Sequence, residues 1–156
     1  MRCVYGQDKS VGGFVARRIA HLHGGIEKFG AFKAVGVVDT SGRPVAGIVF
    51  HDYQPDYRTC QISMASATPM WAKPEIITEL LSIPFKQYGV FKVFTIIPHT
   101  SLKVIKFNLH LGFVREGVGR HQFGKGSHAV FCGMIEPEFR KMVRRLTEPR
   151  NIQKAA

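Results

Sequence analysis

The first half of the chain combines one helical pattern with three extended apolar runs. Within residues 14–25, apolar residues recur at the spacing of one helix face, and two glycines are expected to end that helix. The runs at 31–39 and 44–53 flank a polar turn that contains glycine, which is typical of a β-hairpin. Small and apolar residues predict a third strand over 59–67.

Helical and extended patterns alternate in the next part of the chain. Apolar spacing predicts a helix over 74–89, which Pro84 is expected to kink or shorten because proline lacks an amide N–H. A β-branched and aromatic run predicts a buried strand over 90–98. A further helix is predicted over 101–111, and Gly112 is expected to end it.

The last part of the chain returns to extended structure. Two strands are predicted within 114–123 and 127–135, followed by a short helix over 136–146. We expect residues 1–150 to form a single domain and residues 151–156 to be a frayed tail. The order of elements predicts an α/β (α+β) fold with a mixed, mostly antiparallel central sheet flanked by helices. A ligand is expected where strand ends diverge.

Composition narrows the class of protein. The chain has 156 residues, of which 45% are hydrophobic, so it can fill a core without cross-links. Cys3, Cys60 and Cys132 are an odd number with no C-x-x-C spacing, and they predict reduced thiols without a disulfide framework or a metal site. No stretch has the apolar length of a signal peptide core or a membrane span. We therefore expect a cytoplasmic protein with no membrane association.

The formal net charge of +11 is the strongest compositional signal. Between Leu80 and Ile135 the only acidic residue is Glu116, against seven basic residues: Lys86, Lys92, Lys103, Lys106, Arg115, Arg120 and Lys125. One basic face is predicted, and its partner is a nucleic acid, a phosphorylated small molecule or an acidic protein surface. The alternative is a charge excess that only keeps the protein soluble.

The segment SLKVIKFNLHLGFVREG, residues 101–117, carries a family resemblance. A helix that ends in Gly112-Phe113, followed by a strand with Glu116-Gly117, resembles the GCN5-related N-acetyltransferase (GNAT) superfamily. The order of elements is similar to that family over roughly residues 10–135. The chain looks most like the GNAT-like proteins of bacteriophages, which implies the host cytoplasm as its location.

The resemblance implies an N-acyltransferase that moves an acetyl or similar group from acetyl-CoA, or another acyl-CoA, to the amine of a small molecule or protein. The resemblance also implies that the amine attacks the acyl group directly in a ternary complex, and it is compatible with a homodimer. The positions that match the family's cofactor-binding segments are Met64, Ala65, Ser66, Ala67, Met70, Trp71, Ala72, Lys73, Ser101, Phe107 and Asn108.

The chain departs from the family pattern at three places. The segment 68–73 has no glycine where the family has a glycine-rich loop that holds the cofactor pyrophosphate, and Pro69 and Pro74 remove two amide donors. Ser101 stands where the family often has asparagine. Asn108 stands where it often has a tyrosine that acts as an acid, and an amide is not a proton donor of that kind.

Three residues are candidates for catalysis. His51 and Asp52 end the strand run over 44–53, and a base there would deprotonate an attacking amine; the alternative is an exposed strand end. Glu116 is either catalytic or a structural partner of nearby basic groups.

Two other hypotheses keep the fold and change the function. One is a bacteriophage enzyme that modifies DNA bases (the Mom type), which the net charge motivates. The other is a non-catalytic binding protein. An open gap between strands 59–67 and 90–97 would favour a pantetheine ligand, and a filled, closed ladder would favour the binding protein.

Overall fold

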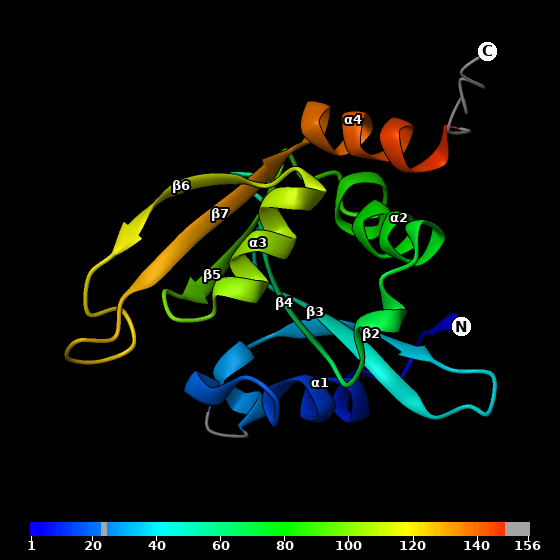
Figure 1. Ribbon diagram of the computed structural model, residues 1–156, viewed down its shortest axis with the longest axis horizontal. Coiled ribbons are helices and arrows are strands. Elements are labelled where there is room, and N and C mark those ends of the chain that lie inside the picture. The colour runs from blue at the N-terminus through cyan, green and yellow to red at the C-terminus, as the bar shows by residue number, and fades with distance from the viewer. Residues whose placement is uncertain (23–24, 149–156) are drawn as a thin grey trace, which may run out of the picture.

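The computed structural model describes residues 1–22 and 25–148, and its described part is built around a seven-stranded sheet (Figure 1). The strand order is β1-β2-β3-β4-β5-β7-β6. The strands are β1 (Arg2–Val4), β2 (Phe32–Val38), β3 (Pro44–Gln54), β4 (Thr59–Ser66), β5 (Lys92–Pro98), β6 (Val114–Gly119) and β7 (Ala129–Ile135). The pair β4–β5 is parallel and the other neighbouring pairs are antiparallel. The predicted mixed, mostly antiparallel sheet is confirmed.

Helices cover both faces of this sheet. They are α1 (Asp8–Ala16), α2 (Pro74–Ser82), α3 (Leu102–Leu111) and α4 (Glu136–Thr147). Helix α1 packs on β2 and β3 from one side and forms a small apolar cluster there. Helices α2, α3 and α4 lie on the opposite side, where Leu80, Phe113 and Phe139 belong to the larger core (Figure 1).

The first helix differs from the prediction over 14–25. Helix α1 spans Asp8–Ala16, and short 3-10 turns follow at Ala20–Leu22 and Ile26–Phe29. Gly12 precedes the predicted helix but lies inside α1, where the Phe32 ring leaves no room for a side chain, because an added Cβ would come within 2.8 Å of it. The helix therefore begins and ends earlier than predicted. Strand β1 was not predicted, and Gly24 and residues 149–156 lie outside the described part.

Pro84 has the predicted effect on the second helix. Helix α2 ends at Ser82, and a π-helical turn, Ile83–Gln87, follows it. Since proline cannot donate to the preceding turn, the regular pattern of hydrogen bonds changes there. Within the described residues, no helix is long and apolar enough to cross a membrane.

Helix α3 ends as predicted at Gly112, which adopts a left-handed conformation with a φ of 115°. The amide N–H of Phe113 donates to the carbonyl of Asn108 (3.1 Å), and the Phe113 side chain is buried behind the helix end. At the other end, Ser101 is the N-cap residue but its side chain makes no capping hydrogen bond.

Replacing Gly112 by alanine should destabilise the fold by about 1 kcal/mol, because a Cβ is unfavourable in the left-handed region. Gly117 is a matched control, since it has an ordinary φ and open space around its Cα. Urea unfolding should show a lower midpoint for Gly112→Ala and little change for Gly117→Ala. Equal effects of both substitutions would contradict this interpretation.

Candidate active site

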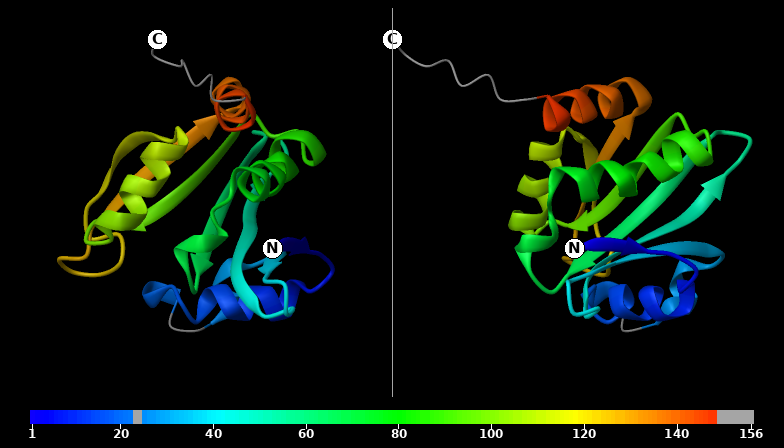
Figure 2. Two further views of the ribbon diagram at one scale, coloured as in Figure 1. Left: turned by 45° about the vertical axis from the view of Figure 1, so that its right-hand side comes forward. Right: turned by 90° about the vertical axis from the view of Figure 1, so that its right-hand side faces the viewer.

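Strands β4 and β5 are paired over only part of their length. Their parallel ladder joins Thr59 to Lys92, Cys60 to Val93 and Gln61 to Phe94, and beyond these three pairs the strands diverge. Figure 2 shows the result: β5, β6, β7 and α3 form one arm, and β2, β3, β4 and α1 form the other. The gap between β4 and β5 is therefore open.

A groove of about 850 Å³ occupies this divergence. One wall is the second half of β4 with the loop that follows it, and the other is the end of β5 with the first turns of α3. The base of the groove includes Trp71, whose ring lies 5.9 Å from the ring of Phe107. The apolar character of both rings suits an aliphatic chain.

Most of the predicted cofactor-binding residues line this groove. They are Met64, Ala65, Ser66, Ala67, Trp71, Ala72, Ser101, Phe107 and Asn108. Met70 and Lys73 are exposed and do not line it. Asn108 is buried, and its side-chain amide donates to the carbonyl of Val104 (2.9 Å), one turn earlier in α3.

The edge of β4 presents amide groups to the groove. The N–H of Ala67 donates to the carbonyl of Val45 in β3 (2.8 Å), and Ser66 lies opposite Ala46 in the register of β3 and β4. Because hydrogen-bonded and non-bonded pairs alternate in an antiparallel ladder, the N–H groups of Met64 and Ser66 point away from β3. Strand β5 no longer pairs with β4 at these positions. These two donors therefore face the groove.

The loop over residues 68–73 uses its own donors internally. Its occupied amide N–H groups are those of Met70, bonded to the Thr68 hydroxyl (3.2 Å), Ala72, bonded to the Pro69 carbonyl (3.3 Å), and Lys73, bonded to the Trp71 carbonyl (2.8 Å). Pro69 and Pro74 have no N–H. The groove thus fits the pantetheine arm of an acyl-CoA, whereas the loop does not fit a diphosphate that needs several free N–H groups.

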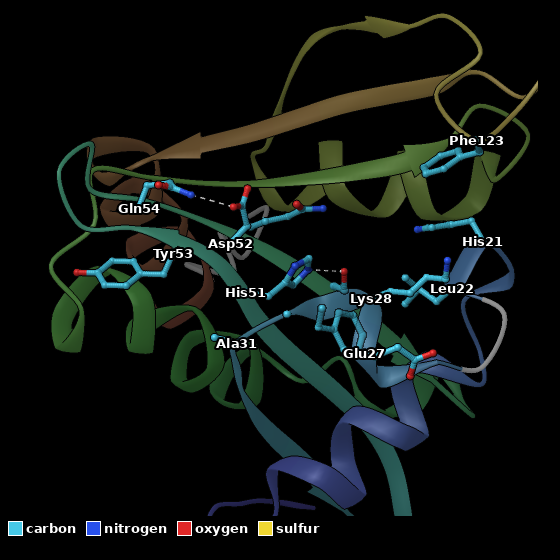
Figure 3. A pocket seen from close by; sticks show the side chains of 14 residues that line it. His21, Leu22, Glu27, Lys28, Ala31, His51, Asp52, Tyr53, Gln54 and Phe123 are labelled. Carbon is cyan, nitrogen blue, oxygen red and sulfur yellow. Dashed lines mark hydrogen bonds between the residues drawn. The ribbon is translucent and has the colours of Figure 1, made fainter.

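A second pocket, of about 720 Å³, adjoins the groove (Figure 3). His21 and Ser63 line both cavities, so the two meet there. Figure 3 shows Phe123 and His21 at one end of the pocket and Tyr53 and Gln54 at the other. The rings of His21 and Phe123 are stacked, with centroids 4.1 Å apart.

The floor of this pocket holds the predicted His51. Its Nε2 lies 2.9 Å from the hydroxyl oxygen of Ser63, and its ring packs 5.0 Å from Phe29. Burial lowers the pKa of His51 to about 4, although the charge of Asp52 acts in the opposite direction. The imidazole is therefore neutral at pH 7. Its unprotonated nitrogen is available to a hydroxyl or an amine.

Asp52 also lines the pocket and has an unusual backbone. Its φ is 49°, which is uncommon for a residue other than glycine, and the pairing of β3 with β4 shifts register between His51 and Gln54. The Asp52 carboxylate accepts a hydrogen bond from the Gln54 side chain (3.0 Å). The irregular strand end thus turns a carboxylate into the pocket next to His51.

The structure does not bring Glu116 together with the other candidates. Its carboxylate lies 2.6 Å from the ammonium of Lys92 and lines neither cavity. A side chain at Gly133 would collide with this carboxylate, so the glycine makes room for the ion pair. This arrangement fits the structural alternative for Glu116.

Sequence reasoning missed Ser63 and Phe123. Ser63 is one of several small residues in a predicted strand, and only the register with β3 places it beside His51. Phe123 lies beyond β6 and reaches the pocket through the fold of the β6–β7 connection. Among the described residues, no group of three or more His, Cys, Asp or Glu side chains is placed to hold a metal ion.

Comparison with known proteins identifies the fold. No family model and no curated protein matches the sequence. A chimera of spermidine N-acetyltransferase SpeG from Vibrio cholerae and hSSAT superposes with a TM-score of 0.70 at 12% identity, over 90% of this chain and 99% of that one. The chain has the GNAT fold.

A second solved structure agrees. The dodecameric spermidine N-acetyltransferase from Vibrio cholerae has a TM-score of 0.63 at 15% identity, over 76% of this chain and 72% of that one. The predicted fold is confirmed by both matches. At these identities the likeness shows the fold alone.

The burial of His51 should appear in the pH dependence of stability. A histidine in the unfolded chain takes up a proton near pH 6.5, whereas the folded pKa is about 4, so between these values the unfolded state binds more protons. The contribution of His51 to the free energy of unfolding is therefore fully present above pH 6.5 and is lost as the pH falls towards 4. Between pH 7 and pH 5, wild type should lose about 1 to 2 kcal/mol more free energy of unfolding than His51→Gln.

Glutamine suits this comparison because its side chain is polar and does not titrate. Urea unfolding of both proteins at several pH values measures the difference, and other titrating groups cancel between them. If both proteins lose the same free energy, His51 is not the group responsible.

Proposed function

We propose that the protein is an N-acyltransferase that moves an acetyl or similar acyl group from an acyl-CoA to an amine in a ternary complex. The observation that carries this proposal is the divergence of β4 and β5, which opens a groove with free amide donors beside a second, polar pocket. A donor in the groove and an acceptor in the pocket would meet at Ser63. The GNAT fold supports this assignment.

The donor arm would lie along β4. The N–H groups of Met64 and Ser66 point into the groove, where they would bind amide and thioester carbonyls of a pantetheine chain. A donor hydrogen bond to the thioester oxygen stabilises negative charge that develops there during attack. An acyl-CoA supplies the activated acyl group, and the residues of the groove orient it.

The acceptor amine would enter through the second pocket. Among the described residues that line it, Asp52 and Glu27 carry negative charge and Lys28 carries positive charge, which favours a ligand that carries positive charge elsewhere in its structure. The reacting amine must be uncharged when its nitrogen attacks the carbonyl carbon. Formation of the N–C bond gives the nitrogen a positive charge, and its proton would pass to His51, directly or through the Ser63 hydroxyl, because the neutral imidazole lies 2.9 Å from that oxygen. From the imidazole, whose pKa is about 4, the proton would pass on to water.

The leaving thiolate would take its proton from water. Asn108 lies in the groove where the family often has a tyrosine, but its amide does not protonate sulfur. Glu116 has no part in this mechanism, because it is paired with Lys92 outside both cavities.

The open groove favours this function over a non-catalytic binding protein. DNA-base modification has no comparable support from the site. A bacteriophage source, a cytoplasmic location and a homodimer stay predictions from the sequence, as does the choice between a small-molecule and a protein acceptor.

A proline scan at the end of β4 tests the donor site. Ser66→Pro removes an N–H that faces the groove, and Ala67→Pro removes the neighbouring N–H that bonds to Val45. Ser66→Pro should weaken acetyl-CoA binding about tenfold or more and change stability little. Ala67→Pro should instead lower the free energy of unfolding by 1 kcal/mol or more, roughly the cost of one ladder hydrogen bond.

Calorimetry with millimolar acetyl-CoA and urea unfolding of the three proteins measure both effects. Unchanged binding by Ser66→Pro would remove β4 from the donor site. Absence of any binding by wild type at millimolar acetyl-CoA would overturn the proposed function itself.

Removing the relay hydroxyl tests the acceptor side. Ser63→Ala should lower kcat for amine acetylation about tenfold to a hundredfold and leave acetyl-CoA affinity nearly unchanged, because the hydroxyl acts on the proton and not on the donor. Thiol release with a panel of primary amines and diamines measures kcat. A normal kcat in Ser63→Ala would exclude the relay through this hydroxyl.

A further inference from the structure

The phosphate end of the groove is built differently from its pantetheine end. The loop over residues 68–73 bonds its own amide groups, and Pro74 occupies the first position of α2, where a helix otherwise offers a free N–H. The first turn of α2 also carries Glu75, whose negative charge repels phosphate. A nucleotide diphosphate therefore finds few donors there.

The rim of the groove is formed by α3, whose outer face is unusually apolar for an exposed helix. Leu102 and Leu109 are 63% and 41% exposed, and Lys106 lies between them at helical spacing. The N-cap residue Ser101, and Lys103 and Val104 of the first turn of α3, line the groove itself, so this outer face continues directly from its mouth. We call Leu102, Lys106 and Leu109 the α3 face.

Positive charge around the groove mouth is not neutralised by the protein. Within residues 1–22 and 25–148, none of the ion pairs includes Lys73, Lys103 or Lys106. The single acid between Leu80 and Ile135, Glu116, is already paired with Lys92. Apolar side chains mixed with free lysines are complementary to an acidic protein surface that also has apolar residues.

We infer that the natural donor is an acyl-pantetheine carried by an acidic protein through a single phosphodiester, with the carrier docked on the α3 face. This inference rests on the proposed acyltransferase function and names its donor. The pantetheine arm would fill the groove. Contacts between the carrier protein and the α3 face would supply the binding energy that, in enzymes with a phosphate-binding loop, comes from contacts with the nucleotide. Free acyl-CoA would then act only as a weak substitute.

The groove and the charge together favour a carrier protein over a nucleic acid. A nucleic acid has the negative charge but no aliphatic arm for the apolar groove beside Trp71 and Phe107. It also gains little from the exposed leucines of the α3 face. A carrier protein satisfies the arm, the charge and the apolar surface at once.

Calorimetry with four probes tests the inference: CoA, 4′-phosphopantetheine, and a small acidic acyl carrier protein with and without its pantetheine arm. The carrier protein with the arm should bind at least tenfold tighter than CoA. CoA should bind within about threefold of 4′-phosphopantetheine, because its nucleotide adds little. Raising NaCl from 50 to 300 mM should weaken carrier binding and leave 4′-phosphopantetheine binding nearly unchanged.

A matched pair of charge reversals locates the docking surface. Lys106→Glu should weaken binding of the armed carrier at least fivefold, with 4′-phosphopantetheine binding within twofold of wild type, since Lys106 does not line the groove. Lys9→Glu makes the same change in α1, on the opposite face of the sheet, and should leave carrier binding unchanged. Circular dichroism checks that both variants fold.

Four results would overturn the inference. CoA binding at least tenfold tighter than 4′-phosphopantetheine would show that the nucleotide is recognised. Carrier binding no tighter than CoA, or weaker than binding of a short DNA duplex in the same buffer, would remove the carrier protein as partner. If none of the pantetheine compounds binds, the proposed acyltransferase function fails together with this inference.

Discussion

The site depends on the way strands β4 and β5 separate after Gln61 and Phe94. A sheet normally satisfies the backbone of each strand from both sides, and a buried N–H without a partner is costly. Beyond the last pair, the N–H groups of Met64 and Ser66 can be satisfied only by water or by a ligand. Each of the two arms has its own covering helix, α1 on one and α3 on the other (Figure 2).

The proposed proton transfer and the lysines near the groove lie in different parts of the molecule. At the junction of the two cavities, burial keeps His51 neutral beside Ser63, so the proposed proton transfer takes place in a pocket of low positive charge. Lys103 instead lines the groove and Lys106 lies further along α3, where both can attract a negatively charged donor. Under the proposed function, this separation would allow a strongly basic protein to bind an amine as its second substrate.

Much of the fold was readable from local patterns. The left-handed stop at Gly112, the shortening of α2 at Pro84 and the hairpin of β2 with β3 follow from the conformational limits of single residues and from apolar periodicity. The family resemblance also located most of the groove residues. The first helix was predicted too late in the chain, because a pattern of apolar positions does not show that Gly12 lies inside α1 close to Phe32, a residue twenty positions away.

The sequence by itself determined the class of fold, the basic character and the absence of glycine from the loop over 68–73, because these depend on residue type and spacing. Only the tertiary structure decided which polar groups meet. Strand register places Ser63 next to His51. Gly133 has no side chain and leaves space for the ion pair of Glu116 with Lys92. The β6–β7 connection brings Phe123 to the pocket. Each is a contact between different strands or loops, which depends on strand register and on the geometry of the sheet and leaves no local pattern.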